Sequence, residues 1–188
     1  MMAAAADPLA PDQLGRQLGR LRPMTELTGR QRVAADAGAR GVNIEFTPRG
    51  QASSLEEAAA NLGIEPREIV KTLVAKAKLT QTATEYSYII ALIPGDRQVD
   101  WAKLRRLAGM KKLSMAAPDD GFAATGYYPG TITPFGALAD DGAQVSIYAD
   151  ESITGRISMG AGEQDLSLFV DSQDLISAYG IVTADICR

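Results

Sequence analysis

Histidine is absent from this chain of 188 residues, and its absence excludes several kinds of site. Without an imidazole there is no Ser-His or Cys-His nucleophile pair, no histidine-ligated zinc and no histidine general base. The single cysteine, Cys187, excludes an internal disulfide and argues against a cysteine metal cluster. We therefore expect no metal site, and a chemistry that makes few demands on the protein if the protein is an enzyme.

Long apolar runs are also missing. No stretch reaches the roughly 18 apolar residues that a membrane-spanning helix needs, and the start of the chain, MMAAAADPLA, lacks the charged and apolar regions of a secretory signal. A hydrophobic content of 46% with 22% charged residues suits one globular domain. These features predict a cytoplasmic protein with no membrane partner.

Charge is unevenly distributed along the chain. The net charge is −4, yet residues 1–112 carry 17 of the 19 Lys and Arg side chains and 12 of the 23 Asp and Glu side chains. An acidic total argues against general coating of DNA, whereas the basic portion is compatible with a local face that contacts phosphate groups. Charge alone is equally compatible with surface charge that only keeps the protein soluble.

The periodicity of apolar residues predicts helices and strands in irregular succession. We expect helices at 11–21, 30–41, 54–63, 66–73, 100–108, 118–124 and 172–180, and strands at 42–46, 86–94, 111–116, 144–149, 156–159 and 165–170. Ser54 with Glu57 is typical of a capping box, and Ser172 is the expected cap of the last helix. This order predicts an α+β, mixed αβ fold: a single domain with one curved mixed or antiparallel sheet surrounded by helices. Residues 1–41 are expected to be a helical extension, and 42–188 the domain itself.

Lys71 stands in EIVKTLVA among apolar residues, near the end of the helix expected at 66–73. Its ammonium group either extends to water and complements the helix dipole, or forms a fixed cation in a pocket. In the second case it holds a phosphate group or a developing oxyanion.

The segment TGYYPGTITPFG, residues 125–136, concentrates glycine and proline. Glycine permits positive φ and a close approach of other groups to the main chain, while proline fixes φ. The segment is either a turn between a helix and a sheet, or a loop whose main-chain groups around Gly130 meet a ligand. In the second case Pro134 fixes its curve, and Tyr127 and Tyr128 either supply a stacking surface or belong to the core.

Other motifs favour structural roles. The carboxylate pairs at 119–120, 140–141 and 150–151 are typical of turns and helix caps. The short GAG at 160–162 lacks the third glycine of a dinucleotide-binding fingerprint, and no P-loop sequence occurs. We therefore expect no nucleotide hydrolysis, no hydride transfer and no cofactor.

These segments, taken in order, resemble one family. SSLEEAAANLGIEPREIVKTLV, IIALIPGDRQVDWAKLRRLAGMKKLSMA, TGYYPGTITPFG, IYADESI and ISMGAG are similar to the YbaK-like aminoacyl-tRNA deacylases, the prolyl-tRNA synthetase-associated editing domain. The resemblance covers about residues 42–188. It implies hydrolysis of a mischarged aminoacyl-tRNA, with the tRNA acceptor end as partner and an aminoacyl-tRNA synthetase as a further partner. A non-catalytic module that binds tRNA, an aminoacyl-adenosine-like ligand or a synthetase is the alternative.

The resemblance also implies the site residues. Lys71 corresponds to the main functional lysine of the family, and Gly130 begins its Gly-x-x-x-Pro loop. Six residues are expected to bind or shape the substrate pocket: Thr72, Gly126, Tyr127, Thr131, Pro134 and Gly160. Thr131 stands where some relatives have a second glycine, and relatives often have serine near Gly160. Four basic residues are candidates for tRNA phosphate contact: Arg105, Arg106, Lys111 and Lys112.

Overall fold

The computed structural model describes residues 26–138 and 145–188, and the helix expected at 11–21 lies outside this part of the chain. The described α-helices are α2 (Gly29–Ala39), α3 (Leu55–Leu62), α4 (Trp101–Leu107), α5 (Pro118–Thr125) and α6 (Ser172–Tyr179), with a 3₁₀ turn η2 (Pro66–Glu68). The strands are β1 (Ile44–Pro48), β2 (Val70–Lys78), β3 (Ser87–Pro94), β4 (Lys112–Met115), β5 (Ser146–Asp150), β6 (Arg156–Gly160), β7 (Leu166–Asp171) and β8 (Val182–Ala184). No described helix is long and apolar enough to cross a membrane.

The strands form two sheets rather than the single curved sheet that the sequence predicts. One sheet has the order β4-β2-β3-β5-β8 and the other the order β1-β7-β6. In the larger sheet β4, β2 and β3 pair antiparallel, whereas β5 joins β3 and β8 joins β5 in parallel. A single parallel bridge, Ile69 to Ser158, connects the start of β2 to β6 of the smaller sheet. The mixed αβ single-domain class is thus confirmed.

Residues 66–73 are the main error in the expected secondary structure. The structure has a 3₁₀ turn with Pro66 at its first position, and then the nine-residue strand β2. Ile69, Val70 and Leu73 fit a helical stripe, but a short apolar run fits a buried strand equally well. The segment forms a strand because it pairs with β3 on one side and β4 on the other. Lys71 therefore lies on a central strand and not at the end of a helix.

Two helix starts illustrate local control. At α3 the Ser54 hydroxyl accepts a hydrogen bond from the Glu57 amide at 3.1 Å, as expected, but the Glu57 carboxylate binds Ser53 rather than Ser54. Gly63 ends this helix in the left-handed conformation, with φ 68°. At α6 the cap is Asp171, whose carboxylate accepts from the amides of residues 173 and 174, and the expected cap Ser172 is the first helical residue.

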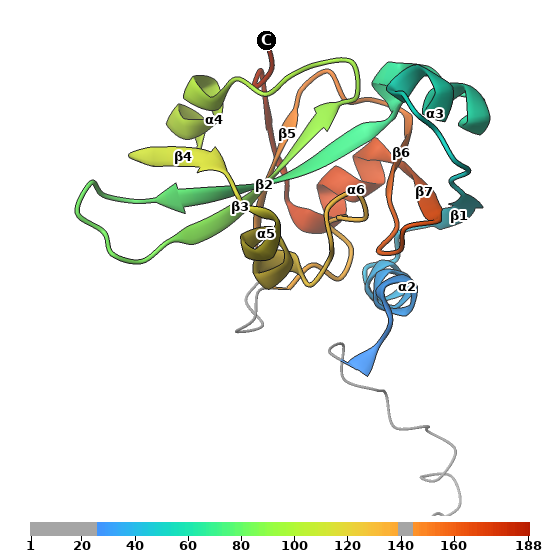
Figure 1. Ribbon diagram of the computed structural model, residues 1–188, viewed down its shortest axis with the longest axis horizontal. Helices are drawn as coiled ribbons and strands as arrows, with labels where there is room; N and C mark the ends of the chain where they lie inside the picture. Colours follow the sequence, from blue (N-terminus) through green and yellow to red (C-terminus); the bar gives the residue numbers. More distant parts are fainter. Residues whose placement is uncertain (1–25, 139–144) are drawn as a thin grey trace, which may run out of the picture.

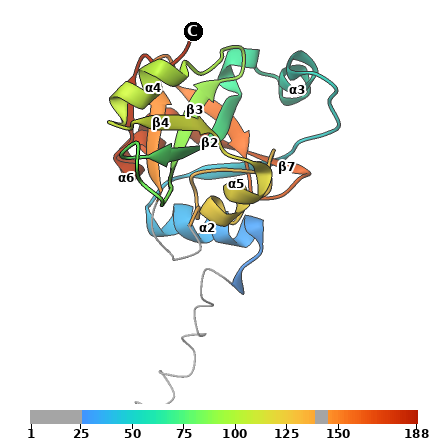
Figure 2. The same cartoon turned by 60° about the vertical axis from the view of Figure 1, so that its left-hand side comes forward.

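Two apolar clusters hold the molecule together. The larger lies among both sheets, α2 and the 125–137 segment, and includes the buried residues Val33, Ala37, Tyr127 and Phe135. The smaller fills the space between the larger sheet, α4 and the C-terminal residues. Helix α2 is thus packed into the main core, and it lies below the sheets in both Figure 1 and Figure 2. The expected division of the chain at residue 41 stays a prediction.

Candidate functional site

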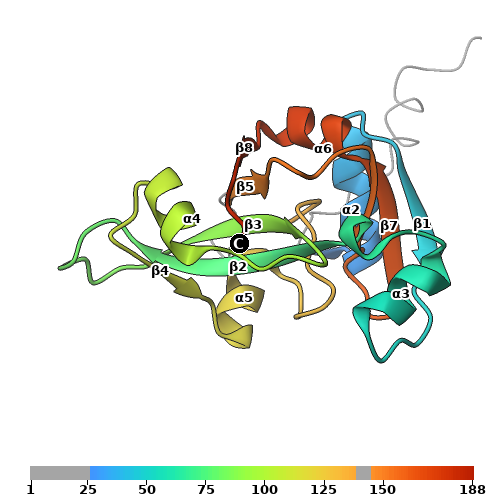
Figure 3. The ribbon, with the colours of Figure 1, turned by 90° about the horizontal axis from the view of Figure 1, so that it is seen from above.

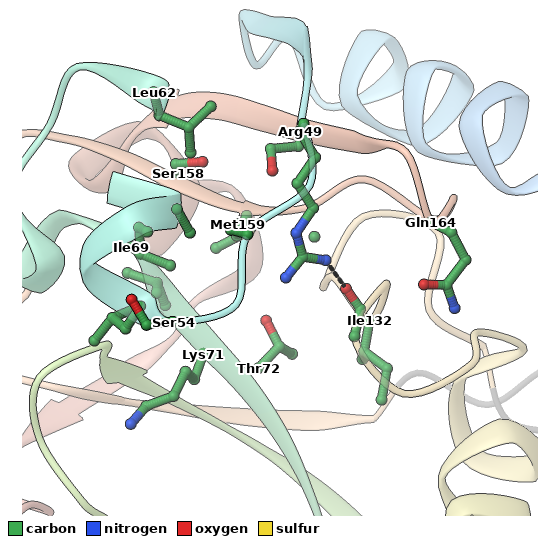
Figure 4. Close-up of a pocket in the computed structure, with 18 of the residues that line it drawn as sticks. Arg49, Ser54, Leu62, Ile69, Lys71, Thr72, Ile132, Ser158, Met159 and Gln164 are labelled. Atoms are coloured by element: carbon green, nitrogen blue, oxygen red, sulfur yellow. Dashed lines mark hydrogen bonds between the residues drawn. The ribbon is translucent and has the colours of Figure 1, made fainter. Parts of the chain in front are cut away.

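A cavity of about 780 Å³ opens between α3, the start of β2, β6 and the loop around Gly130. Figure 4 shows its lining residues, and Figure 3 shows α3 and β2 from above. Its size is within the range of small-ligand sites. The lining side chains are Arg49, Gln51, Ala52, Ser53, Ser54, Leu55, Ala58, Leu62, Ile69, Val70, Lys71, Thr72, Leu73, Ile132, Ser158, Met159, Gln164 and Ser167, with Gly50, Gly130 and Gly160 contributing backbone.

Charge in this cavity has one sign. Among the described residues that line it, the only charged side chains are the cations Arg49 and Lys71, and no carboxylate takes part. Because no lining carboxylate neutralises these two cations, the cavity favours a ligand that carries phosphate groups, or one whose carbonyl oxygen gains negative charge during a reaction. The described lining contains no carboxylate and no imidazole.

Lys71 is fixed by the main chain. Its Nζ donates a hydrogen bond to the carbonyl oxygen of Arg97 at 2.6 Å, and its side chain is half-buried. The strand holds the backbone in place because Lys71 pairs with Ile93 on β3. In Figure 4 the side chain extends along the cavity wall, away from Arg49. An ammonium group has three donors, so two remain for a ligand.

Thr72, the next residue on β2, carries a buried hydroxyl group. Its Oγ1 has no hydrogen-bond partner among the described residues. A buried polar atom without a partner costs about 1–3 kcal/mol of folding free energy. Because Thr72 lines the cavity, a ligand group that exchanges a hydrogen bond with this oxygen would recover that cost.

Arg49 joins two walls of the cavity. Its Nη1 donates to the carbonyl oxygen of Gly130 at 2.7 Å, the dashed line in Figure 4. Its own amide donates to the carbonyl oxygen of Asp165 at 2.8 Å. Gly130 has φ 85°, a conformation that side chains disfavour. Sequence reasoning did not single out Arg49, since its contact is with a residue 81 positions away.

Gly160 explains why the loop and β6 lie so close. A Cβ atom at this position would stand 2.5 Å from the carbonyl oxygen of Ile132 and 2.8 Å from that of Thr131. The Gly162 amide also donates to the Thr131 carbonyl oxygen at 2.9 Å. Backbone therefore packs directly on backbone at this wall.

Helix α2 supports the same loop from behind. Arg32 Nη2 donates to the Gly126 carbonyl oxygen at 2.7 Å, and its Nε donates to the Tyr127 hydroxyl at 3.2 Å. Asp36 accepts a hydrogen bond from the Gly136 amide at 2.7 Å. The Tyr127 hydroxyl in turn donates to the Phe135 carbonyl oxygen at 2.6 Å. The contacts of Arg32 and Asp36 join α2 to residues 94 to 100 positions away, and they gave no signal in the sequence.

The expected site residues divide into three groups. Lys71, Thr72, Gly130 and Gly160 line the same cavity. The described lining does not include Gly126, Tyr127, Thr131 or Pro134, which lie in the loop behind it. The exposed Arg105, Arg106, Lys111 and Lys112 lie on α4 and at the start of β4, elsewhere in the molecule. The roles of all these residues stay predictions.

Behind Lys71 lies a buried carboxylate. Asp150, fully buried, accepts hydrogen bonds from Arg97 at 3.1 Å and from the Ile186 amide at 3.1 Å. Burial raises the pKa of Asp150, but the hydrogen bonds from Ser152, Cys187 and the Ile186 amide together hold that pKa below its usual value. Burial and this carboxylate raise the pKa of the Cys187 thiol to about 12. Asp150 thus fixes the turn whose carbonyl oxygen receives Lys71.

The described residues include no cluster of three or more Cys, Asp or Glu side chains able to hold a metal ion. The carboxylate pair at 140–141 lies outside them. Asp120 binds Lys76 at 2.9 Å and the Tyr88 hydroxyl at 3.0 Å.

Comparison with known proteins places this geometry in a class of tRNA-editing domains. The family model described as an aminoacyl-tRNA editing domain matches residues 49–178. The chain therefore belongs to the aminoacyl-tRNA editing domain family, of the YbaK-like, prolyl-tRNA synthetase-associated type.

The chain is similar in sequence to several named proteins. The chain is 32% identical over 127 residues to the proline–tRNA ligase of Limosilactobacillus fermentum, covering 66% of this chain and 21% of the ligase. It is 39% identical over 83 residues to EbsC of Enterococcus faecalis, named as a candidate Cys-tRNA(Pro)/Cys-tRNA(Cys) deacylase, covering 44% and 47% of the two chains. The chain thus spans about a fifth of the ligases it matches.

The fold is also similar to solved structures. A candidate trans-editing enzyme for prolyl-tRNA synthetase aligns with a TM-score of 0.72 and 22% identity, covering 85% of this chain and 97% of that one. The hypothetical protein APE2540 aligns with a TM-score of 0.72 and 24% identity, covering 84% and 99%. At these identities the likeness establishes the fold.

Proposed function

We propose that the protein is a trans-acting deacylase, which hydrolyses the ester bond of a mischarged aminoacyl-tRNA. The observation that carries the proposal is a fixed ammonium group next to a buried hydroxyl that has no hydrogen-bond partner among the described residues. Lys71 and Thr72 provide these groups at consecutive positions of β2, and both residues line the cavity. Family membership supplies the substrate class, and the cytoplasm is the compartment in which such a substrate is met.

The chemistry suits the cavity. An aminoacyl ester is already activated, so the protein mainly has to position it and stabilise the negative oxygen of the tetrahedral intermediate. When water attacks, its oxygen bonds to the ester carbon, the bond from that carbon to the ribose oxygen breaks, and the proton that the water loses balances the one that the ribose oxygen takes up. The products of this route are the amino acid and free tRNA.

Lys71 is the proposed electrostatic group. Its ammonium supplies hydrogen bonds to the ester oxygen or to the terminal phosphate, while Thr72 holds a polar group of the substrate. Gly130 and Gly160 form the backbone wall, and Thr131 and Pro134 fix the loop that Gly126 and Tyr127 support. The nucleophile is water, or a thiol or hydroxyl of the aminoacyl group itself. The second route releases a cyclic product, which distinguishes the two.

The test is single-turnover deacylation of alanyl-, cysteinyl- and seryl-tRNA on proline and threonine acceptors. We expect wild type to discharge at least one species, and Lys71→Ala to do so about a hundredfold more slowly, the effect of removing one preorganised electrostatic group. Thermal unfolding of both proteins controls for folding. Equal rates for wild type and a folded Lys71→Ala variant would refute the role of the lysine. Saturable tRNA binding with no discharge by wild type would favour a non-catalytic module.

A further inference from the structure

One end of the larger sheet gathers positive charge. We call six residues there the basic edge: Lys76 and Lys78 on β2, Arg105 and Arg106 in the last turn of α4, and Lys111 and Lys112 at the start of β4. Strand β4 is the outer strand of this sheet. Figures 1 and 3 place α4, β4 and the β2–β3 hairpin at the end of the molecule opposite to α3.

Within the basic edge, like charges face each other. Lys78 stands directly across from Lys112 in the register of β2 and β4, and the Lys111 amide donates to the Lys78 carbonyl oxygen at 2.9 Å. Like charges that face each other across strands destabilise a sheet. Of the six cations only Lys76 forms an ion pair with a described carboxylate, that of Asp120. The neighbouring exposed acids, Glu85 and Asp119, are fewer than the remaining cations, so a bound polyanion would relieve the repulsion.

Exposed aromatic rings lie beside these cations. The Tyr86 ring is 50% exposed, and the ammonium groups of Lys76 and Lys78 lie 4.2 and 4.4 Å from its centre. Phe122 on α5 and Tyr128, two residues before the cavity-lining Gly130, are 38% and 64% exposed, with ring centres 4.5 Å apart. Cationic grooves with aromatic stacking surfaces are typical of sites that bind nucleic-acid strands.

The cavity and the basic edge are connected by one strand. Alternation along β2 places Thr72, Lys76 and Lys78 on the same face of the sheet, the face covered in part by α5. Lys78 lies six positions after Thr72, a distance of about 20 Å at about 3.3 Å per residue. In a stacked strand, whose phosphates are spaced about 3.4 Å along the helix axis, this distance corresponds to about six nucleotides.

We propose that the basic edge binds the phosphate backbone of an RNA whose 3′ end occupies the cavity, with bases near that end stacking on Phe122 and Tyr128. The basic edge thus contacts phosphate groups of the arm that carries the ester, about six nucleotides from its 3′ end. This inference rests on the proposed function for the identity of the RNA. It adds Lys76, Lys78, Tyr86 and Phe122 to Tyr128 and the four basic residues singled out in the sequence.

The experiment measures binding of uncharged tRNA(Pro), labelled at its 5′ end, by fluorescence anisotropy over a range of salt concentrations. The variant is Lys78→Gln/Lys112→Gln, and the matched control is Arg156→Gln, an exposed cation of the smaller sheet. We expect the double variant to bind at least about tenfold more weakly at low salt, and its plot of log affinity against log salt to be less steep by about 2. The control should match wild type. Thermal unfolding should show the double variant to be no less stable, because two opposed charges are removed.

A shorter RNA tests the distance. The tetranucleotide ACCA ends before the basic edge, so its binding should not depend on the two lysines, whereas that of an acceptor-stem minihelix should. Wild-type affinity and salt dependence in the folded double variant would overturn the proposal, as would equal lysine dependence for ACCA and tRNA. Deacylation of charged tRNA is followed in parallel. If wild type discharges nothing but the lysines are needed for binding, the basic edge stands and the proposed function fails.

Discussion

At the scale of single residues, the candidate site depends on two consecutive residues, Lys71 and Thr72, that differ in their hydrogen bonding. Lys71 and Thr72 are consecutive on a strand, so their side chains leave the sheet on opposite faces, yet both line the cavity because it lies at the end of β2. The lysine is held by a carbonyl oxygen, whereas the threonine hydroxyl lacks a partner in the described structure. Without ligand, the lysine ammonium has one hydrogen-bond partner, and the threonine hydroxyl has none in the described part of the chain.

Replacing Thr72 by valine separates stability from activity. We expect Thr72→Val to raise the free energy of unfolding by about 1 kcal/mol, because it removes a buried hydroxyl that has no partner in the described protein. The same change should slow deacylation by about tenfold, since the substrate loses a hydrogen bond of about 1.4 kcal/mol. Urea unfolding and single-turnover kinetics measure the two effects. Thr72→Ser keeps the hydroxyl and serves as the control; a fully active or destabilised valine variant would contradict the assignment.

At the scale of elements, α2 acts as a support for the loop that forms the cavity wall. Arg32 reaches Gly126 and Tyr127, and Asp36 reaches Gly136, so one helix holds both ends of the loop. The family match starts at residue 49, after this helix. The site thus includes a contribution from outside the matched residues.

Removing the Arg32 guanidinium should disturb the loop more than the fold. We expect Arg32→Ala to lower kcat by about tenfold or more, because small displacements of positioning groups have effects of that size, while KM changes little. Addition of free guanidinium should restore part of kcat, which a merely destabilised protein would not show. Arg30→Ala, on the same helix beside Phe46, is the control. Unchanged kcat in Arg32→Ala would contradict a positioning role.

At the scale of the whole molecule, Asp150 joins distant parts of the chain. It binds Arg97 after β3, Ser152 after β5 and the Ile186 amide near the C-terminus. A buried carboxylate with this many donors stabilises the assembly only while it is ionised.

Asp150→Asn gives a pH-dependent loss of stability. The pKa of Asp150 in the folded protein is lowered, so its contribution is complete above about pH 4, near the pKa of an unfolded Asp, and is lost as the pH falls through the folded pKa. We expect the variant to be on the order of 2 kcal/mol less stable than wild type at neutral pH, with a smaller difference in acid. Urea unfolding at both pH values measures this. Asp96→Asn, an exposed residue in the turn that carries Arg97, should show no such difference. A stability difference between Asp150→Asn and wild type that grows in acid would contradict the expectation.

Most of the elements could be predicted from the sequence because their signals are local. Alternation predicted β1 and β7, Ser54 predicted the start of α3, and Asp100 the start of α4. The strand at 70–78 could not be predicted in this way. Its apolar run fits a helix and a buried strand equally well, and only pairing with β3 and β4 makes it a strand. The split into two sheets likewise depends on long-range pairing.

The candidate site could be predicted only in part. Lys71, Thr72, Gly130 and Gly160 were named in advance and line one cavity. Arg49 and Arg32 were not, because each acts on main-chain oxygens far along the chain. Carbonyl oxygens have no sequence signature, so partners of this kind appear only when the chain is folded.

The backbone contact between Gly160 and residues 131–132 also bears on how such pockets change over time. Two main chains in direct contact leave no side chain at that wall to enlarge or trim. New preferences for a substrate must then arise at the other walls, where Met159, Ile132 and Leu62 present side chains of adjustable size. A rigid backbone wall beside walls made of side chains allows the ligand preference of the cavity to change without rebuilding the domain.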